Sequence, residues 1–289
     1  MLPECSRTEL VRLTSRNAFL LLIGPIGFFV LFFVLPFTQL VGESLSGSRG
    51  WTLDNYADVL ADAYYWKALV DTLLISLLVT LVTFLAGYPL AYFMIFHLRS
   101  AALRRFSYVL LVTPLFTSNI VRAFAWIVIL GRRGMVNAGL LGIGLIDAPV
   151  DLLYNKLSII VGLAYILLPL MVLTVCSVLQ SLDRALIDAA RDLGARPSVA
   201  FLTVTLPLSL PGVVAGSIIV FALSVSAYVI PSILSGGREI VMSMLIFQQY
   251  MATFRPDIGA TLSVVLLVVT LALIAAYAYG VERRTRTAM

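Results

Sequence analysis

The sequence predicts an all-α membrane protein with about six transmembrane helices, and three observations support this class. Hydrophobic residues make up 61% of the 289 residues and charged residues 12%, whereas soluble domains usually contain about 25% charged residues. Six mostly apolar runs follow one another along the chain, each near the roughly 20 residues that a spanning helix needs. The runs also lack the period-two alternation of outer-membrane strands. One helical bundle therefore accounts for most of the chain.

The first run follows several arginines, as the apolar part of a secretory signal peptide also does. A signal peptide has only about 7–15 residues in that part, followed by a small-residue cleavage site. This run is longer, so we expect a retained helix. The six runs, with edges set to within several residues, are Ala18–Val41, Leu69–Phe96, Phe106–Leu130, Leu157–Leu179, Val213–Leu234 and Gly259–Gly280.

The basic residues give the chain an expected orientation, because arginine and lysine are enriched in cytosolic loops. With the N-terminus in the cytosol, twelve basic residues fall in inner segments, seven fall in outer segments, and Arg122 lies within a span. Both termini are then cytosolic. The expected order is a cytosolic tail at 1–17, a first transmembrane helix at 18–41, an external loop at 42–66, a core at 67–280 containing a cytosolic loop at 183–206, and a cytosolic tail at 281–289.

The chain lacks the residues of a Walker-type ATP site. Such a site needs a lysine directly after glycine and before Ser or Thr. The only lysines, Lys67 and Lys156, follow tryptophan and asparagine. ATP is therefore not expected to bind to this chain.

Catalytic and metal sites are equally unsupported by the residues present. The single histidine, His97, has no second histidine or nearby thiol with which to hold a metal or build a triad. Cys5 and Cys176 are too few for a disulfide framework and are interpreted as free thiols. We predict no catalytic residue, no metal and no bound cofactor. The basic charge balance is interpreted as loop charge in a membrane protein, not as nucleic-acid binding.

Polar residues inside the apolar runs are candidates for a translocation route, because charge in a bilayer is costly and usually functional. Arg122, one turn after Asn119, is either a structural ion pair, with Asp71 as the suggested partner, or part of the route. Pro231 interrupts helix hydrogen bonding late in the fifth run, and broken helices at membrane depth line cavities or pack in protein. The candidate pathway or gate residues are Asp71, Asn119, Arg122, Tyr165, Tyr228 and Pro231.

The segment Asp188–Gly212 (DAARDLGARPSVAFLTVTLPLSLPG) is polar at its start and lies between two long apolar runs. Gly194 is typical of the residue that ends a short helix, and Pro197 suits the first turn of the next helix. Two consecutive alanines give a small face that another protein can approach closely. An ordinary cytosolic loop remains the alternative interpretation.

This segment resembles the "EAA" loop of the membrane subunits of binding-protein-dependent ABC importers. The shared features are an acidic residue followed by two alanines, then Gly-Ala, an aromatic residue, Leu-Pro-Leu and Pro-Gly; Asp188 stands where the family usually has Glu. The resemblance implies a type I importer transmembrane domain whose loop forms a coupling helix on a partner ATPase, which would carry ATP and Mg²⁺. The residues expected to couple are Asp188, Ala189, Ala190, Arg191, Asp192, Gly194 and Ala195.

Other stretches resemble the spermidine/putrescine branch of this family, and in particular the first, "B"-type, of its two permease subunits. They are Thr52–Tyr56, Gly87–Phe93, Thr113–Trp126 and Ile159–Asp183, so the resemblance covers about Thr52 to Gly280. It implies a multi-pass protein of a bacterial inner membrane that imports a small solute, for which a polyamine is the expected choice. The implied partners are a second related permease, an ATP-binding subunit dimer and an external substrate-binding protein.

Other functions remain as alternatives. The wider branch also includes permeases for iron and phosphonates, and cargo choice there rests largely on the external binding protein. A secondary transporter would need intramembrane carboxylates or broken helices that carry ion coupling. A membrane-embedded enzyme would need clustered His, Cys or acidic residues. The sequence shows no clear carboxylate in the middle of a run and no such cluster.

Overall fold

The computed structural model describes residues 15–47, 50–98 and 100–288, with side chains between Leu22 and Arg283 apart from Glu282. Most of the predicted tail at 1–17, including Cys5, therefore lies outside the described residues. Six helical stretches in the described part are long and apolar enough to cross a membrane, which confirms the predicted all-α membrane class. They are Leu22–Ser44, Ala63–Phe96, Asn119–Gly142, Lys156–Ser181, Pro197–Val225 and Pro256–Val281.

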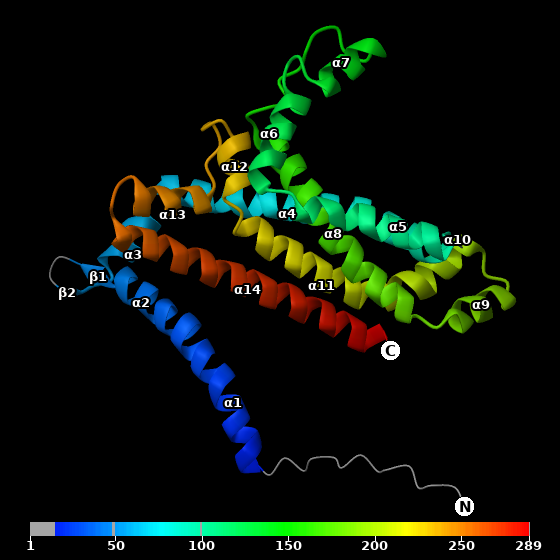
Figure 1. Cartoon of the computed structure of the whole chain (residues 1–289), viewed down its shortest axis with the longest axis horizontal. Helices are drawn as coiled ribbons and strands as arrows, with labels where there is room; N and C mark the ends of the chain where they lie inside the picture. The colour runs from blue at the N-terminus through cyan, green and yellow to red at the C-terminus, as the bar shows by residue number, and fades with distance from the viewer. Residues whose placement is uncertain (1–14, 48–49, 99, 289) are drawn as a thin grey trace, which may run out of the picture.

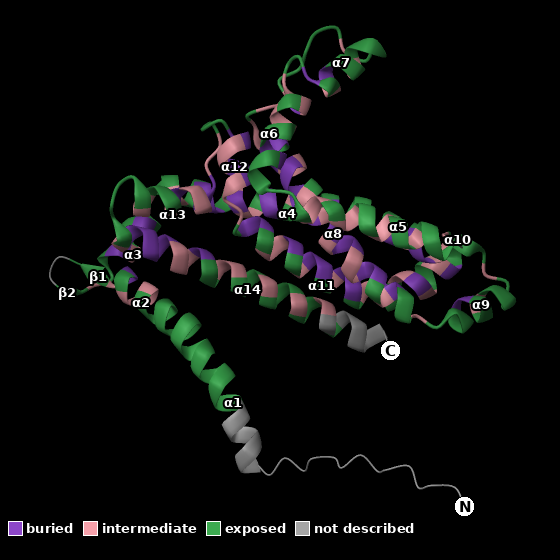
Figure 2. Ribbon diagram, viewed as in Figure 1, coloured by how far each residue is buried: buried purple, intermediate pink, exposed green. Residues whose placement is uncertain are grey.

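Three long helices form the centre of the bundle: α4 (Ala63–Phe96), α8 (Lys156–Ser181) and α11 (Leu206–Val225). Figure 2 shows their facing sides as the main buried region of the molecule. Glycine permits close approach of α11 to α8, because a Cβ at Gly216 would lie 2.5 Å from the Thr174 hydroxyl. Small residues at such contacts are typical of helices that pack in membranes.

A second cluster lies at one end of the bundle, called here the α3 end. There α3 (Asp54–Ala61), α13 (Met242–Met251) and the start of α14 (Pro256–Ala288) pack against the first turns of α4 (Figure 1). A two-stranded antiparallel pair, β1 (Ser46–Gly47) and β2 (Gly50–Trp51), adjoins α3. At the opposite end, called here the α9 end, α9 (Arg184–Asp192) and α10 (Pro197–Ala200) project beyond the central helices.

The first candidate span differs from the others in its surroundings. It comprises α1 (Ser15–Phe29), a π-helical stretch (Val30–Val34) and α2 (Leu35–Ser44). Every side chain from Leu22 to Gln39 is exposed, and Figure 1 shows α1 leading away from the bundle. Only the end of α2 packs closely, against α14. The expected first helix is thus present, but it is joined to the rest at one end.

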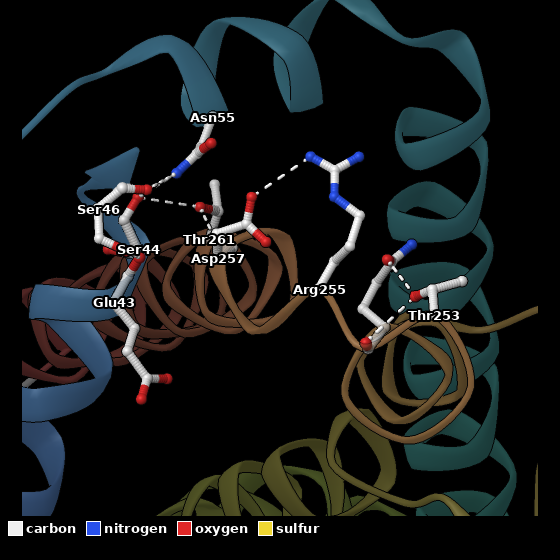
Figure 3. A network of polar contacts seen from close by, with 9 residues as sticks. Glu43, Ser44, Ser46, Asn55, Thr253, Arg255, Asp257 and Thr261 are labelled. Carbon is white, nitrogen blue, oxygen red and sulfur yellow. Dashed lines mark hydrogen bonds and ion pairs between the residues drawn. The ribbon is translucent and has the colours of Figure 1, made fainter. Parts of the chain in front are cut away.

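Polar contacts join that end to the bundle (Figure 3). The Asn55 side-chain amide donates to the backbone carbonyls of Ser44, at 3.2 Å, and Ser46, at 2.9 Å. The Ser44 hydroxyl lies 2.8 Å from the Tyr56 hydroxyl, and the Thr261 hydroxyl donates to the Ser44 carbonyl over 3.2 Å. We call Ser44, Ser46, Asn55, Tyr56 and Thr261 the fastening network, because they connect α2, α3 and α14.

Two neighbouring contacts extend the polar surface around this network. Arg255 pairs with Asp257 at 3.3 Å, as Figure 3 shows. Burial raises the pKa of the Tyr250 hydroxyl above its usual value, and the nearby carboxylate of Glu43 raises it further. Tyr250 is therefore neutral at physiological pH.

The third span does not follow the predicted run Phe106–Leu130. That run is divided between α5 (Ala101–Val112), a 3-10 turn (Thr113–Phe116) and α6 (Asn119–Leu130), and the candidate span continues through α7 (Met135–Gly142). Pro114 lies in the turn and has no backbone N–H to donate, and Thr117 then adopts an extended backbone. Apolar continuity alone therefore gave the wrong limits for this span.

The fifth predicted run, Val213–Leu234, is likewise two helices. The helical path starts earlier, at Pro197, and passes through a π-helical stretch (Phe201–Thr205) into α11, while α12 (Val229–Leu234) follows a break at 226–228. The break precedes Pro231, which occupies the third position of α12, where a backbone N–H has no partner within the helix. The Ser243 hydroxyl donates to the freed carbonyl of Ala227 over 2.7 Å, which compensates for the interruption.

Candidate functional site

The predicted coupling segment forms a short helix at the α9 end of the bundle. The Asp183 carboxylate caps α9 by accepting a hydrogen bond from the Ala185 backbone N–H at 2.9 Å. Ile187 alone of the α9 residues is buried, where it anchors the helix to the bundle. The rest of the helix is therefore positioned by its two ends and one apolar anchor.

The C-terminal end of α9 has the geometry predicted for Gly194. This glycine has a φ of +87°, in the left-handed region that residues with a Cβ rarely adopt. Its N–H donates to the Arg191 carbonyl at 2.8 Å, and the Ala195 N–H donates to the Ala190 carbonyl at 3.1 Å. These two bonds form a Schellman motif, which ends the helix and turns the chain towards Pro197. Pro197 is the first residue of α10, as predicted.

The predicted coupling residues lie together on this helix and its exit. Asp188 and Arg191 approach to 4.0 Å one turn apart, and this exposed pair adds little stability. Ala190 and Ala195 are half-buried, whereas the other five are exposed: Asp188, Ala189, Arg191, Asp192 and Gly194. A charged edge thus accompanies a strip of small residues.

Sequence reasoning missed two apolar residues of the same surface. Leu186 and Leu193 are exposed on either side of Ala189, and Leu193 is 90% exposed. The three stand at i, i+3 and i+7, the spacing of one helix face, which is the signal that could have found them. We call Leu186, Ala189, Ala190 and Leu193 the α9 stripe. Exposed leucines on a capped helix outside the bundle suit a protein–protein contact.

A second group of predicted residues meets where α6 packs against α8 and α12. Arg122 is 8% exposed, and its Nη2 donates to the Asn119 side chain at 2.5 Å. Within the described residues, its Nε and Nη1 have no hydrogen-bond partner. Tyr165 of α8 lies edge-on to Trp126, one turn after Arg122, with ring centres 5.6 Å apart. Asn119, Arg122 and Tyr165 are therefore brought together.

The suggested pairing of Arg122 with Asp71 is wrong. Asp71, on α4, instead accepts a hydrogen bond from the Lys156 ammonium, with a distance of 2.5 Å between Oδ1 and Nζ. Asn119 takes the nearest Arg122 donor because the two are three residues apart on one helix. Asp71 thus belongs to a separate charged group that includes Glu239.

The remaining pathway candidates flank the broken fifth run. Tyr228 lies in the break, with its ring 4.5 Å from that of Phe247 on α13. Pro231 is buried in α12, which packs against α6. Neither touches the Asp71 pair by any described hydrogen bond or ion pair. Asp71 is therefore paired apart from the other predicted pathway residues, which lie on α6, on α8 and around α12.

The model of the family described as "Binding-protein-dependent transport system inner membrane component" matches residues 83–287. The chain belongs to this family. The permease is 31% identical to the spermidine/putrescine transport system permease protein PotB of Salmonella typhimurium (strain SL1344), over 89% of its own length and 91% of that protein. The PotB of Escherichia coli (strain K12) is 30% identical over 86% and 92% of the two chains.

Solved structures agree with this family at the level of fold. The permease superposes on a bacterial ABC transporter involved in alginate import with a TM-score of 0.77 and 21% identity, covering 93% of this chain and 96% of that one. The family, the relatives and the helices together make this permease a multi-pass inner-membrane transport subunit.

Proposed function

We propose that this permease forms half of the pathway of an ATP-driven importer whose cargo is a polyamine such as spermidine or putrescine. The proposed cargo rests on the similarity to PotB, at 31% identity over 89% of the chain. Iron or a phosphonate would suit the same class of importer, but the relatives favour a polyamine.

The energy for transport would come from ATP hydrolysis by a partner subunit. The sequence has no glycine–lysine Walker pair, so energy must arrive through a protein contact. We assign this contact to the seven coupling residues together with Leu186 and Leu193 of the α9 stripe, against an ATP-binding subunit dimer that carries ATP and Mg²⁺. A second related permease would complete the pathway, and an external binding protein would deliver the cargo.

The experiment that tests the cargo is uptake by the reconstituted complex with its binding protein. Labelled putrescine and spermidine should accumulate only when ATP is supplied. Ferric iron and a labelled phosphonate serve as the comparison. Uptake of either of these, with no uptake of a polyamine, would overturn the proposed cargo while keeping the importer class.

The proposed orientation places both termini and the α9 end in the cytosol. Ser198 is exposed near the start of α10, so a Ser198→Cys variant reports on this end. An impermeant thiol reagent should label it only after the membrane is opened. Labelling in intact cells would reverse the orientation.

A further inference from the structure

The charged group around Lys156 holds an ammonium between two carboxylates. The Lys156 Nζ lies 2.5 Å from Oδ1 of Asp71 and 4.0 Å from Oε2 of Glu239. The three residues come from different places: Asp71 from α4, Lys156 from the start of α8, and Glu239 from the segment between α12 and α13. The Asp71 side chain is only 13% exposed, so its charge needs a cation nearby.

Other contacts position the carboxylates without the lysine. The Met242 backbone N–H donates to the Thr72 hydroxyl at 2.8 Å, which joins the segment after Glu239 to the residue after Asp71. The Ser158 hydroxyl donates to the Leu234 carbonyl at 3.1 Å, which joins α8 to the end of α12. These two bonds keep the three elements together, so the site does not depend on Lys156 for its shape.

Lys156 pairs closely with Asp71, but its place in the fold and its side chain favour exchange of its ammonium for another cation. It is the first residue of α8, and the positive end of a helix dipole disfavours a cation there. Its ammonium is carried by a flexible chain of four carbons, and its side chain is 37% exposed. The lysine can therefore leave towards solvent while its backbone stays in place.

A primary ammonium on a four-carbon chain is also putrescine without its second ammonium group. The six candidate spans contain three carboxylates among their described side chains: Glu43 and Asp257 lie one residue from a span end, and Asp71 lies eight residues inside. Asp71 is thus the described carboxylate placed deepest along a span. Together with Glu239, it offers the group that a cationic cargo would need.

We propose that Asp71 and Glu239 form a binding site for a primary ammonium group of the cargo, and that Lys156 occupies it as a tethered competitor until the cargo displaces it. This inference rests on the proposed polyamine cargo. The exchange of one ammonium for another leaves the charge of the site unchanged, so the site need never be left with unpaired carboxylates.

The test measures equilibrium binding of labelled putrescine to the assembled complex in lipid nanodiscs without binding protein. Lys156→Met removes the competitor and should raise the affinity about fivefold, as expected for an ion pair at the upper end of those measured near protein surfaces. Lys156→Arg should lower the affinity below wild type, because a guanidinium binds carboxylates through two hydrogen bonds. A purely structural ion pair would predict no change in affinity for either variant.

Matched controls separate this site from general charge effects. Lys67→Met removes the other lysine, which is exposed, and should leave the affinity unchanged. Adding Asp71→Asn to Lys156→Met should abolish the gain, whereas adding Asp58→Asn, on the exposed face of α3, should keep it. Lys156→Arg keeps the ion pair and should assemble even where Lys156→Met does not.

Two outcomes would overturn the inference, and they are distinguishable. Wild-type uptake of putrescine with unchanged affinity in the assembled Lys156 variants, or a gain that survives Asp71→Asn, would reject the site alone. Absence of both putrescine uptake and putrescine binding in every variant would reject the polyamine cargo and the site with it.

Discussion

The two ends of the bundle differ in the contacts that their side chains make. At the α3 end, the fastening network pairs the buried polar groups of α2, α3 and α14 with one another. At the α9 end, a capped helix exposes a leucine that is 90% accessible and is anchored by one buried isoleucine. The first end joins three helices through hydrogen bonds within this chain, whereas the second ends in a short helix that carries the proposed contact with the ATPase. Substitutions at each end test this difference.

The largest expected effect is at the α9 end. Leu193→Asp places a charge in the proposed contact with the ATPase, and loss of a buried apolar anchor at an interface commonly costs about 2 kcal/mol or more. Uptake and the stimulation of ATP hydrolysis by loaded binding protein should both fall at least tenfold, measured on the purified complex. Leu145→Asp makes the same change at another exposed leucine and should leave both unchanged. Equal behaviour of the two variants would contradict the coupling assignment.

A smaller effect is expected at the α3 end, and on stability instead of coupling. Asn55→Leu leaves the carbonyls of buried Ser44 and exposed Ser46 without this donor, a loss of about 1–3 kcal/mol. The midpoint of thermal unfolding in detergent should fall. Asp58→Leu, on the exposed face of the same helix, should not lower it. An unchanged midpoint for Asn55→Leu would show that the network does not fasten the first span.

Arg122 is buried, and of its guanidinium nitrogens Nη2 has a hydrogen-bond partner within the described residues, whereas Nε and Nη1 have none. Arg122→Met removes a charge with two unpartnered nitrogens in the described structure, so stability should stay constant or rise by about 1 kcal/mol. If Arg122 lines the route, uptake should fall while assembly persists. A lower yield of assembled complex would indicate a structural role instead. Normal assembly with normal uptake would exclude both roles.

The smallest expected effect is at Gly194, where substitutions distinguish backbone strain from steric clash. No atom lies within 4 Å of a Cβ built there, but its φ is +87°. A side chain should therefore meet backbone strain and not a clash. Gly194→Val should weaken coupling more than Gly194→Asn, because asparagine tolerates the left-handed region better, with a difference of about 1 kcal/mol. Equal losses in the binding of the ATPase would point to packing against the partner.

Sequence reasoning predicted the features that depend on local chemistry. The turn at Gly194 and the start of a helix at Pro197 follow from the backbone preferences of glycine and proline. The membrane class follows from composition. The limits of the third span did not, because Thr113–Phe116 is as apolar as its neighbours and its break depends on backbone geometry.

The sequence also did not predict which residues far apart in the chain pair with each other. Asp71 and Lys156 are 85 residues apart, and nothing in the apolar pattern indicates which of the chain's basic residues meets Asp71. Arg122 looked like the natural partner because both charges lie inside apolar runs. The packing of α4 against α8 brings Lys156 to Asp71, and that packing depends on the whole bundle.

The fastening network also has a consequence for synthesis. Thr261 lies 217 residues after Ser44, to whose carbonyl it donates. At the roughly 5–20 residues per second of translation, the first span is made tens of seconds or less before its last contact exists. During that interval it can diffuse within the bilayer while the central helices assemble. The first span thus makes its contacts with α3 early in synthesis and gains its contact with α14 only near the end.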